Sequence, residues 1–218
     1  MSRPKPALPV EQLRITWQSA SLLLGYPDES LLARTGLLRQ AAALLPARVG
    51  DPLRGFLDHA ERTPLPELTA SYVETFDHRR RGCLYLTYFA HGDTRRRGMA
   101  LLRFQQTYRR AGLVLDAGEL PDHLAVVLEF GATADPDGAW ALLLDHRAGL
   151  ELLRMALRDS GSAWAGVVEA VTGTLPALRG DEQEAVLRLA AAGPPEEEVG
   201  LAPFAPPDHL PASTGGRP

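Results

Sequence analysis

The chain contains a single cysteine, Cys83, and no long uninterrupted apolar run. One cysteine cannot form an intramolecular disulfide, and it cannot build a metal site of several thiolates. No segment approaches the roughly 18 uncharged apolar residues that a membrane-spanning helix needs. The first residues also lack the apolar stretch of about 7 to 15 residues that marks a secretory signal. These absences predict a cytoplasmic protein.

Motifs of catalysis are missing as well. The sequence has no GxSxG elbow, no GxxxxGK[ST] phosphate loop and no glycine fingerprint after a strand. Five of the six histidines directly follow an aspartate, but neighbouring residues of a helix point about 100° apart and cannot share a metal ion. A helical metalloenzyme would need His78, His91 and His123 to converge, and this stays an alternative. The leading expectation is a protein that is not an enzyme and that holds no metal or cofactor.

Helical periodicity runs along most of the chain. Leu13, Trp17, Ala20 and Leu24 form one apolar stripe, which ends at Gly25. Similar patterns, divided by proline and glycine, predict further helices over residues 31–45, 52–61 with Asp51 as its cap, 66–76, 94–111, 121–130, 139–158, 162–172 and 181–192, with a turn at 135–138. No alternating β-branched run appears. We therefore predict an all-α, single-domain bundle of about eight to ten helices.

The two ends of the chain differ from the middle. Residues 193–218 are rich in proline and acidic side chains, so they cannot bury enough apolar surface to offset the entropy lost on ordering. We predict a disordered N-terminus over residues 1–9, a helical domain over 10–192 and a disordered tail over 193–218.

Charge is distributed unevenly along the chain. Nine arginines and one acid, Asp93, lie between His78 and Arg110, whereas seventeen acids and six arginines follow from Leu113 onward. Such a basic island can attract nucleic acid, an acidic partner or the acidic half of the same chain, and it can also be an ordinary solvated face. A helical nucleic-acid-binding protein using residues 79–110 is therefore a second alternative, although no helix-turn-helix pattern supports it.

Aromatic residues concentrate around this stretch, since residues 71–113 hold seven of the eleven phenylalanines and tyrosines. They can form a packed core, or they can line a groove for the apolar face of a client helix, with arginines at its rim. Our hypothesis for such a groove places the following side chains in its wall: Tyr72, Phe76, Tyr85, Tyr88 and Leu124. Arg95, Arg96 and Arg97 would steer or clamp acidic groups on the client or the phosphates of a cofactor. Residues 91–94 read as a tight turn whose Asp93 caps the next helix.

Several of these stretches resemble the NarJ-type assembly chaperones of respiratory nitrate reductase, part of the TorD, DmsD and NarJ family of redox-enzyme maturation proteins. The resemblance covers about residues 12 to 204. It is carried by residues 72–77 (YVETFD), 84–88 (LYLTY), 91–95 (HGDTR), 97–101 (RGMAL), 119–124 (ELPDHL) and 23–28 (LLGYPD).

The resemblance implies an all-helical fold without a cofactor of its own. It implies binding to the N-terminal segment of the nitrate reductase catalytic (alpha) subunit and support for molybdenum cofactor insertion before membrane attachment. Molybdenum cofactor biosynthesis proteins are further candidate partners. The family's acidic–Pro–Asp–His element, linked to client or nucleotide-cofactor recognition, matches Glu119, Pro121, Asp122 and His123. The alternative for this element is plain helix capping, with Asp122 and Glu119 near a positive helix end.

The complete set of expected client-binding residues combines these patterns. It comprises Tyr72, Phe76, Leu84, Tyr85, Tyr88, His91, Asp93, Arg95, Arg96, Arg97, Phe104, Tyr108, Glu119, Pro121, Asp122, His123 and Leu124.

Overall fold

The computed structural model describes residues 4–77, 80–92, 94–116 and 118–192. Within these ranges the chain forms eleven α-helices, one short 3₁₀-helix and no named strand, which confirms the all-α prediction. The helices are α1 (Val10–Leu23), α2 (Glu29–Ala43), α3 (Ala47–Arg62), α4 (Leu65–Phe76), α5 (Tyr88–His91), α6 (Arg95–Arg110), α7 (Leu124–Thr133), α8 (Pro136–Asp145), α9 (Arg147–Asp159), α10 (Ala165–Thr174) and α11 (Gly180–Ala192), and the 3₁₀-helix is η1 (Arg80–Gly82). The predicted tail, residues 193–218, lies outside the described residues.

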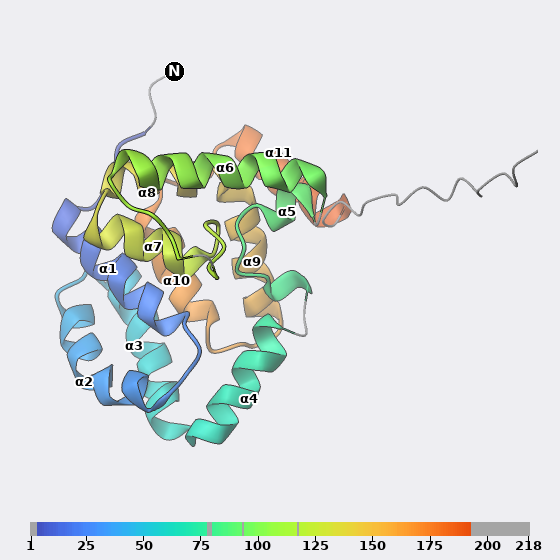
Figure 1. The fold of residues 1–218 in the computed structure, drawn as a ribbon. Coiled ribbons are helices and arrows are strands. Elements are labelled where there is room, and N and C mark those ends of the chain that lie inside the picture. The colour runs from blue at the N-terminus through green and yellow to red at the C-terminus, as the bar shows by residue number, and fades with distance from the viewer. Residues whose placement is uncertain (1–3, 78–79, 93, 117, 193–218) are drawn as a thin grey trace, which may run out of the picture.

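Helix α1 packs against α7, α10 and α2 (Figure 1). Its predicted apolar stripe is confirmed, since Trp17, Ala20 and Leu24 are completely buried. The indole of Trp17 donates to Thr174 Oγ1 at 3.2 Å. Gly131 lets α7 approach closely, because a Cβ at that position would lie 2.7 Å from Trp17 Cε3. Trp17 is therefore a tightly packed residue in the core of the bundle.

The end of α1 is fixed by two aromatic side chains from distant helices. Tyr72 of α4 donates its hydroxyl to the Leu24 carbonyl at 2.9 Å, and Trp164 donates Nε1 to the Leu23 carbonyl at 3.0 Å. The last carbonyls of a helix have no partner inside it, so these bonds satisfy groups that would otherwise be buried unpaired. The Tyr72 and Phe76 rings lie 4.8 Å apart and both pack on Trp164 at 5.5 Å. Part of the predicted aromatic cluster is thus core.

Helix α3 starts earlier than the Asp51-Pro52 pair predicted. It begins at Ala47 after Pro46, whose carbonyl accepts bonds from the amides of Val49 and Gly50. Pro52 is inside the helix, where its ring removes only the bond that would reach the Arg48 carbonyl. The expectation that Asp51 caps this helix is therefore wrong.

Two further expectations needed correction around α8. Residues 135–138 are the start of this helix and not a separate turn, because Asp135 accepts from the Gly138 amide at 2.9 Å and Pro136 occupies the first helical position. The single helix expected over 139–158 is divided at His146, whose backbone leaves helical geometry at φ −110° and ψ 19°. The chain therefore turns a corner between α8 and α9.

Candidate functional site

The acidic–Pro–Asp–His element pairs with an equally irregular segment that precedes α5. The Leu86 amide donates to the Asp122 carbonyl at 2.9 Å, and the Leu124 amide donates to the Leu84 carbonyl at 2.8 Å. These two bonds hold the segments antiparallel, with an isolated bridge between Tyr85 and His123. Segments about 35 residues apart in the sequence are thereby joined beside the start of α7.

The Asp122 carboxylate lies at the centre of this junction and is completely buried. Its Oδ2 accepts from the Thr87 hydroxyl at 2.5 Å and from the Thr87 amide at 3.2 Å. Arg97 of α6 donates Nε to Thr87 Oγ1 at 3.1 Å and places Nη2 3.6 Å from Asp122 Oδ2. A buried carboxylate needs such partners, because an unpaired charge in a protein interior is costly. The capping interpretation is wrong for Asp122, which bonds across to another segment.

Tyr85 and His123 enclose the outer side of the junction. The Arg97 guanidinium lies 5.2 Å from the centre of the Tyr85 ring, and the His123 ring meets the same tyrosine edge-on at 5.3 Å. Burial lowers the pKa of His123, although the neighbouring Asp122 opposes this shift. The imidazole is therefore neutral at physiological pH. The Tyr85, Arg97 and His123 side chains therefore pack on one another and fix one another's orientation.

Tyr108 ties helix α6 to the same element. Its hydroxyl donates to the Pro121 carbonyl at 2.5 Å, and its ring lies 4.6 Å from that of Phe130 on α7. Burial raises the pKa of Tyr108, so the hydroxyl keeps its proton and remains a donor. The loop between α6 and α7 is consequently anchored at its base.

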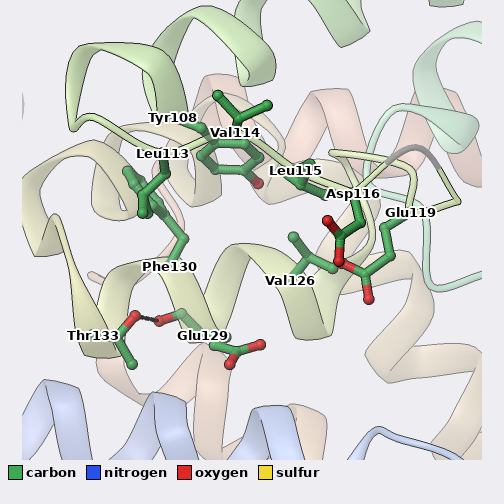
Figure 2. A pocket seen from close by; sticks show the side chains of 10 residues that line it. All are labelled: Tyr108, Leu113, Val114, Leu115, Asp116, Glu119, Val126, Glu129, Phe130 and Thr133. Carbon is green, nitrogen blue, oxygen red and sulfur yellow. Dashed lines mark hydrogen bonds between the residues drawn. The ribbon is translucent and has the colours of Figure 1, made fainter.

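A pocket of about 290 Å³ opens beside this anchor (Figure 2). The residues that line the pocket are mainly apolar, and three of the lining residues are exposed and carry a carboxylate. The lining residues are Tyr108, Leu113, Val114, Leu115, Asp116, Glu119, Val126, Glu129, Phe130 and Thr133. We call this the acid-rimmed pocket. Sequence reasoning identified only Tyr108 and Glu119 here, although the apolar run 113–115 directly after Gly112 was a usable signal.

Many of the expected client-binding residues are interior residues. The buried ones are Tyr72, Phe76, Leu84, Phe104, Tyr108, Pro121, Asp122 and Leu124. Side chains in the core cannot line an open groove, so the expected groove of Tyr72, Phe76 and Leu124 with Tyr85 and Tyr88 is wrong for this conformation. Tyr85, Tyr88, His91, Arg97 and His123 are half-buried, and Arg95, Arg96 and Glu119 are exposed. Asp93 lies outside the described residues.

The basic island is partly engaged with the rest of the protein. Arg97 faces Asp122, and Arg103 of α6 reaches Asp145 of α8 at 2.5 Å. These contacts use arginines that a nucleic-acid interface would need. Of the three histidines considered for a metal site, His78 lies outside the described residues. Over the part of the chain that the structure describes, no group of three or more metal-binding side chains comes together.

No helix among the described residues is both long enough and apolar enough to cross a bilayer.

Comparison with known proteins gives consistent matches. The family model described as nitrate reductase delta subunit matches residues 42–170. The chain is 39% identical over 160 residues to the nitrate reductase-like protein NarX of Mycobacterium tuberculosis, and this match spans 73% of the chain but only 24% of NarX. It is 32% identical over 166 residues to the probable nitrate reductase molybdenum cofactor assembly chaperone NarJ of Bacillus subtilis, spanning 74% of the chain and 89% of that protein.

The relatives extend to Escherichia coli and to a solved structure. The nitrate reductase molybdenum cofactor assembly chaperone NarJ of Escherichia coli is 36% identical over 149 residues, spanning 66% of the chain and 63% of that NarJ. A putative redox enzyme maturation protein from Archaeoglobus fulgidus superposes with a TM-score of 0.53 at 24% identity, covering 78% of this chain and 94% of that one. This last likeness shows a shared fold.

Proposed function

Because the chain belongs to the nitrate reductase delta subunit family, we propose that it is the assembly chaperone of a respiratory nitrate reductase. In this role it binds the unfinished catalytic subunit and supports insertion of the molybdenum cofactor before the enzyme attaches to the membrane. The observation that carries the proposal is the match to Bacillus subtilis NarJ, a probable nitrate reductase molybdenum cofactor assembly chaperone, which spans 89% of that protein. The 166 matched residues therefore cover nearly the whole length of that relative.

A second part of the proposal concerns the segment of the catalytic subunit that is recognised. We infer that the chain recognises the N-terminal segment of the catalytic subunit, in the cytoplasm, and that it catalyses no reaction and needs no cofactor of its own. Molybdenum cofactor biosynthesis proteins are the further partners that this role requires. A leader segment recognised by a surface of modest area gives an affinity that still permits release, because ordering the peptide takes back about 2 to 5 kcal/mol of the interaction energy.

Accessible residues of the expected set supply the contact surface in this proposal. Tyr85 and Tyr88 are half-buried, and Arg95 and Arg96 are exposed at the start of α6. We propose that these two arginines attract acidic groups on the client or the phosphates of the cofactor. The buried junction of Asp122 and Thr87 then acts as a positioning element, because it holds the Tyr85 segment and the start of α7 in one register.

Co-purification tests the proposed function. The tagged chain is isolated from cells that contain the full nitrate reductase catalytic subunit, from cells with a version lacking its first 20 or so residues, and from cells without the subunit. We expect capture of the full subunit and at least a tenfold loss for the shortened one. Cells that lack the chain should accumulate catalytic subunit without molybdenum cofactor. Full nitrate reductase activity in those cells would reject the proposal.

A further inference from the structure

We propose that the acid-rimmed pocket binds a cationic and apolar stretch of the client, with an apolar side chain in the cavity and lysine or arginine side chains against Asp116, Glu119 and Glu129. The inference rests on the proposed function, because the occupant is placed in the N-terminal segment of the nitrate reductase catalytic subunit. It adds a site and a chemical class of partner segment to that function.

The size of the pocket suits side chains. Its volume of about 290 Å³ falls at the lower edge of the roughly 300 to 1,000 Å³ of small-molecule sites. A cavity of about 150 Å³ holds a benzene-sized group. The pocket therefore accommodates one or two large apolar side chains of a peptide, and it is small for a whole dinucleotide cofactor.

The negative charges around the pocket are not paired with basic side chains in the described part of the protein. Asp116, Glu119 and Glu129 are exposed, and no arginine, lysine or histidine of the described residues forms an ion pair with any of them. Figure 2 shows the Asp116 and Glu119 carboxylates close together at one end of the pocket beside Val126, with Glu129 on the facing helix. Neighbouring like charges repel, so a cationic partner gains from all three at once.

Apolar surface is left open beside these carboxylates. Val114 is 83% exposed and Leu113 is 42% exposed, both in the loop that forms one wall. Large exposed apolar side chains that adjoin a concave surface mark interaction sites, because covering them removes apolar area from water. The combination of open apolar side chains and unpaired carboxylates fits a segment in which apolar residues alternate with lysine or arginine.

The pocket is formed in advance of binding. Its floor belongs to α7, and the Tyr108 hydroxyl bond to Pro121 fixes the loop at the point where it returns to that helix. The Glu119 amide bonds to the Asp116 carbonyl at 3.2 Å, which sets the spacing of the two carboxylates. A preformed site loses less entropy on binding than a mobile one.

The test measures binding of a fluorescent peptide made from the first 20 or so residues of the catalytic subunit, by anisotropy at 50 and 500 mM salt. The site variant carries Asp116→Asn, Glu119→Gln and Glu129→Gln. A matched control carries Glu67→Gln, Asp181→Asn and Glu184→Gln, which removes the same charge from exposed positions on α4 and α11. A second peptide has glutamine in place of each lysine and arginine. Val114→Ser and Leu37→Ser, both at exposed apolar positions, compare the pocket with a remote surface.

We expect the site variant to weaken binding of the natural peptide about five- to fiftyfold at 50 mM salt, since exposed ion pairs contribute modestly and three are removed. The control variant should change the dissociation constant less than twofold, and the site variant should bind both peptides alike. Val114→Ser should weaken binding more than Leu37→Ser. Equal effects of the site and control variants would overturn the pocket and leave the chaperone role intact. Absence of any binding by the unaltered protein, together with failed co-purification, would overturn both.

Discussion

Thr87 Oγ1 donates a hydrogen bond of 2.5 Å to Asp122 Oδ2, and this bond joins the segment before α5 to the segment before α7. Both residues are completely buried. The remaining oxygen of this carboxylate, Oδ1, has no hydrogen-bond partner among the described residues. The junction therefore depends on the few donors that reach Oδ2.

Replacing Thr87 by valine should lower the free energy of unfolding by about 2 to 3 kcal/mol, because a buried carboxylate loses a donor at nearly constant volume. Urea denaturation followed by circular dichroism measures this change. The control is Thr69→Val, whose exposed hydroxyl bonds only to the Pro66 carbonyl within α4, and which should change the stability by less than about 0.5 kcal/mol. Equal stability of the two variants would contradict the central role of the Thr87 bond.

Helices α7 and α1 pack closely together at Gly131. A Cβ there would lie 2.5 Å from the Ala139 Cβ and 2.7 Å from Trp17 Cε3. Gly131→Ala should therefore destabilise the protein by about 1 to 3 kcal/mol through overpacking. The matched change Gly36→Ala, on the exposed face of α2 where no atom lies within 4 Å, should stabilise it by about 0.5 to 1 kcal/mol. Thermal melting of both variants checks the opposite signs.

His146 makes the stability depend on pH. Burial lowers its pKa to about 4 from the ordinary value of 6.5, although Asp145 opposes the shift. Between these two values the unfolded chain binds more protons than the folded one, so stability is lost as the pH falls from about 7 to 4, by on the order of 2 to 3 kcal/mol.

His146→Phe isolates this contribution, because it retains a ring against Phe104, which lies 5.1 Å away. Denaturation at pH 7, 5.5 and 4.5 should show a shallower fall in stability for this variant than for the unaltered protein. The comparison uses the difference between the two curves, because groups far from His146 contribute the same change to both proteins. Parallel curves would mean that the imidazole already charges freely in the folded state.

Tyr72 and Tyr26 offer a matched pair of hydroxyls. Their rings meet edge-on at 5.5 Å, but the Tyr72 hydroxyl is bonded to the Leu24 carbonyl whereas Tyr26 is 60% exposed. Tyr72→Phe should cost about 1 to 2 kcal/mol, because a buried carbonyl at the end of α1 loses its partner. Tyr26→Phe should stay within about 0.5 kcal/mol. Chemical denaturation of the two single variants decides between them.

Arg95 and Arg96 should speed the capture of acidic groups of the client, at the opposite end of α6 from Tyr108 and the acid-rimmed pocket. The Arg95→Ala, Arg96→Ala double variant is expected to slow association about three- to tenfold at 50 mM salt, and the difference should fade at 500 mM, where exposed charges are screened within a few ångströms. Arg34→Ala with Arg188→Ala removes the same charge from other exposed positions and should have little effect. Stopped-flow mixing with labelled peptide gives these rates, and a salt-independent rate would rule out the steering role.

The sequence predicted the fold well where local signals and tertiary packing agree. The stripe of Leu13, Trp17 and Ala20 has a helical period, and proline or glycine ends the helix, so both its existence and its buried face were readable. The predicted start of α3 was too late, because Pro52 was interpreted as the first residue of the helix. Pro52 instead lies inside the helix, where it removes only one backbone hydrogen bond. The corner at His146 was missed because no proline or glycine marks it.

The site was harder to predict for a physical reason. Aromatic and arginine side chains have the same composition whether they line a groove or fill a core, and only the burial of Tyr72, Phe76 and Phe104 separates the two cases. The Asp122 junction depends on a contact between segments about 35 residues apart, which spacing does not reveal. The acid-rimmed pocket lies beside the bond between the Tyr108 hydroxyl and the Pro121 carbonyl, and the sequence does not reveal that this bond forms.

The position of α1 affects how the protein is made. Ser21 bonds to the Ala125 carbonyl, Leu23 accepts from Trp164, and Trp17 donates to Thr174, at separations of 104, 141 and 157 residues. A ribosome adds about 5 to 20 residues per second, so these partners emerge roughly 5 to 30 seconds after α1. Throughout that interval the growing chain exposes the apolar face of α1, which later helices cover in the folded protein. The buried face of α1 can therefore be fully covered by its native partners only after Thr174 has been added to the chain.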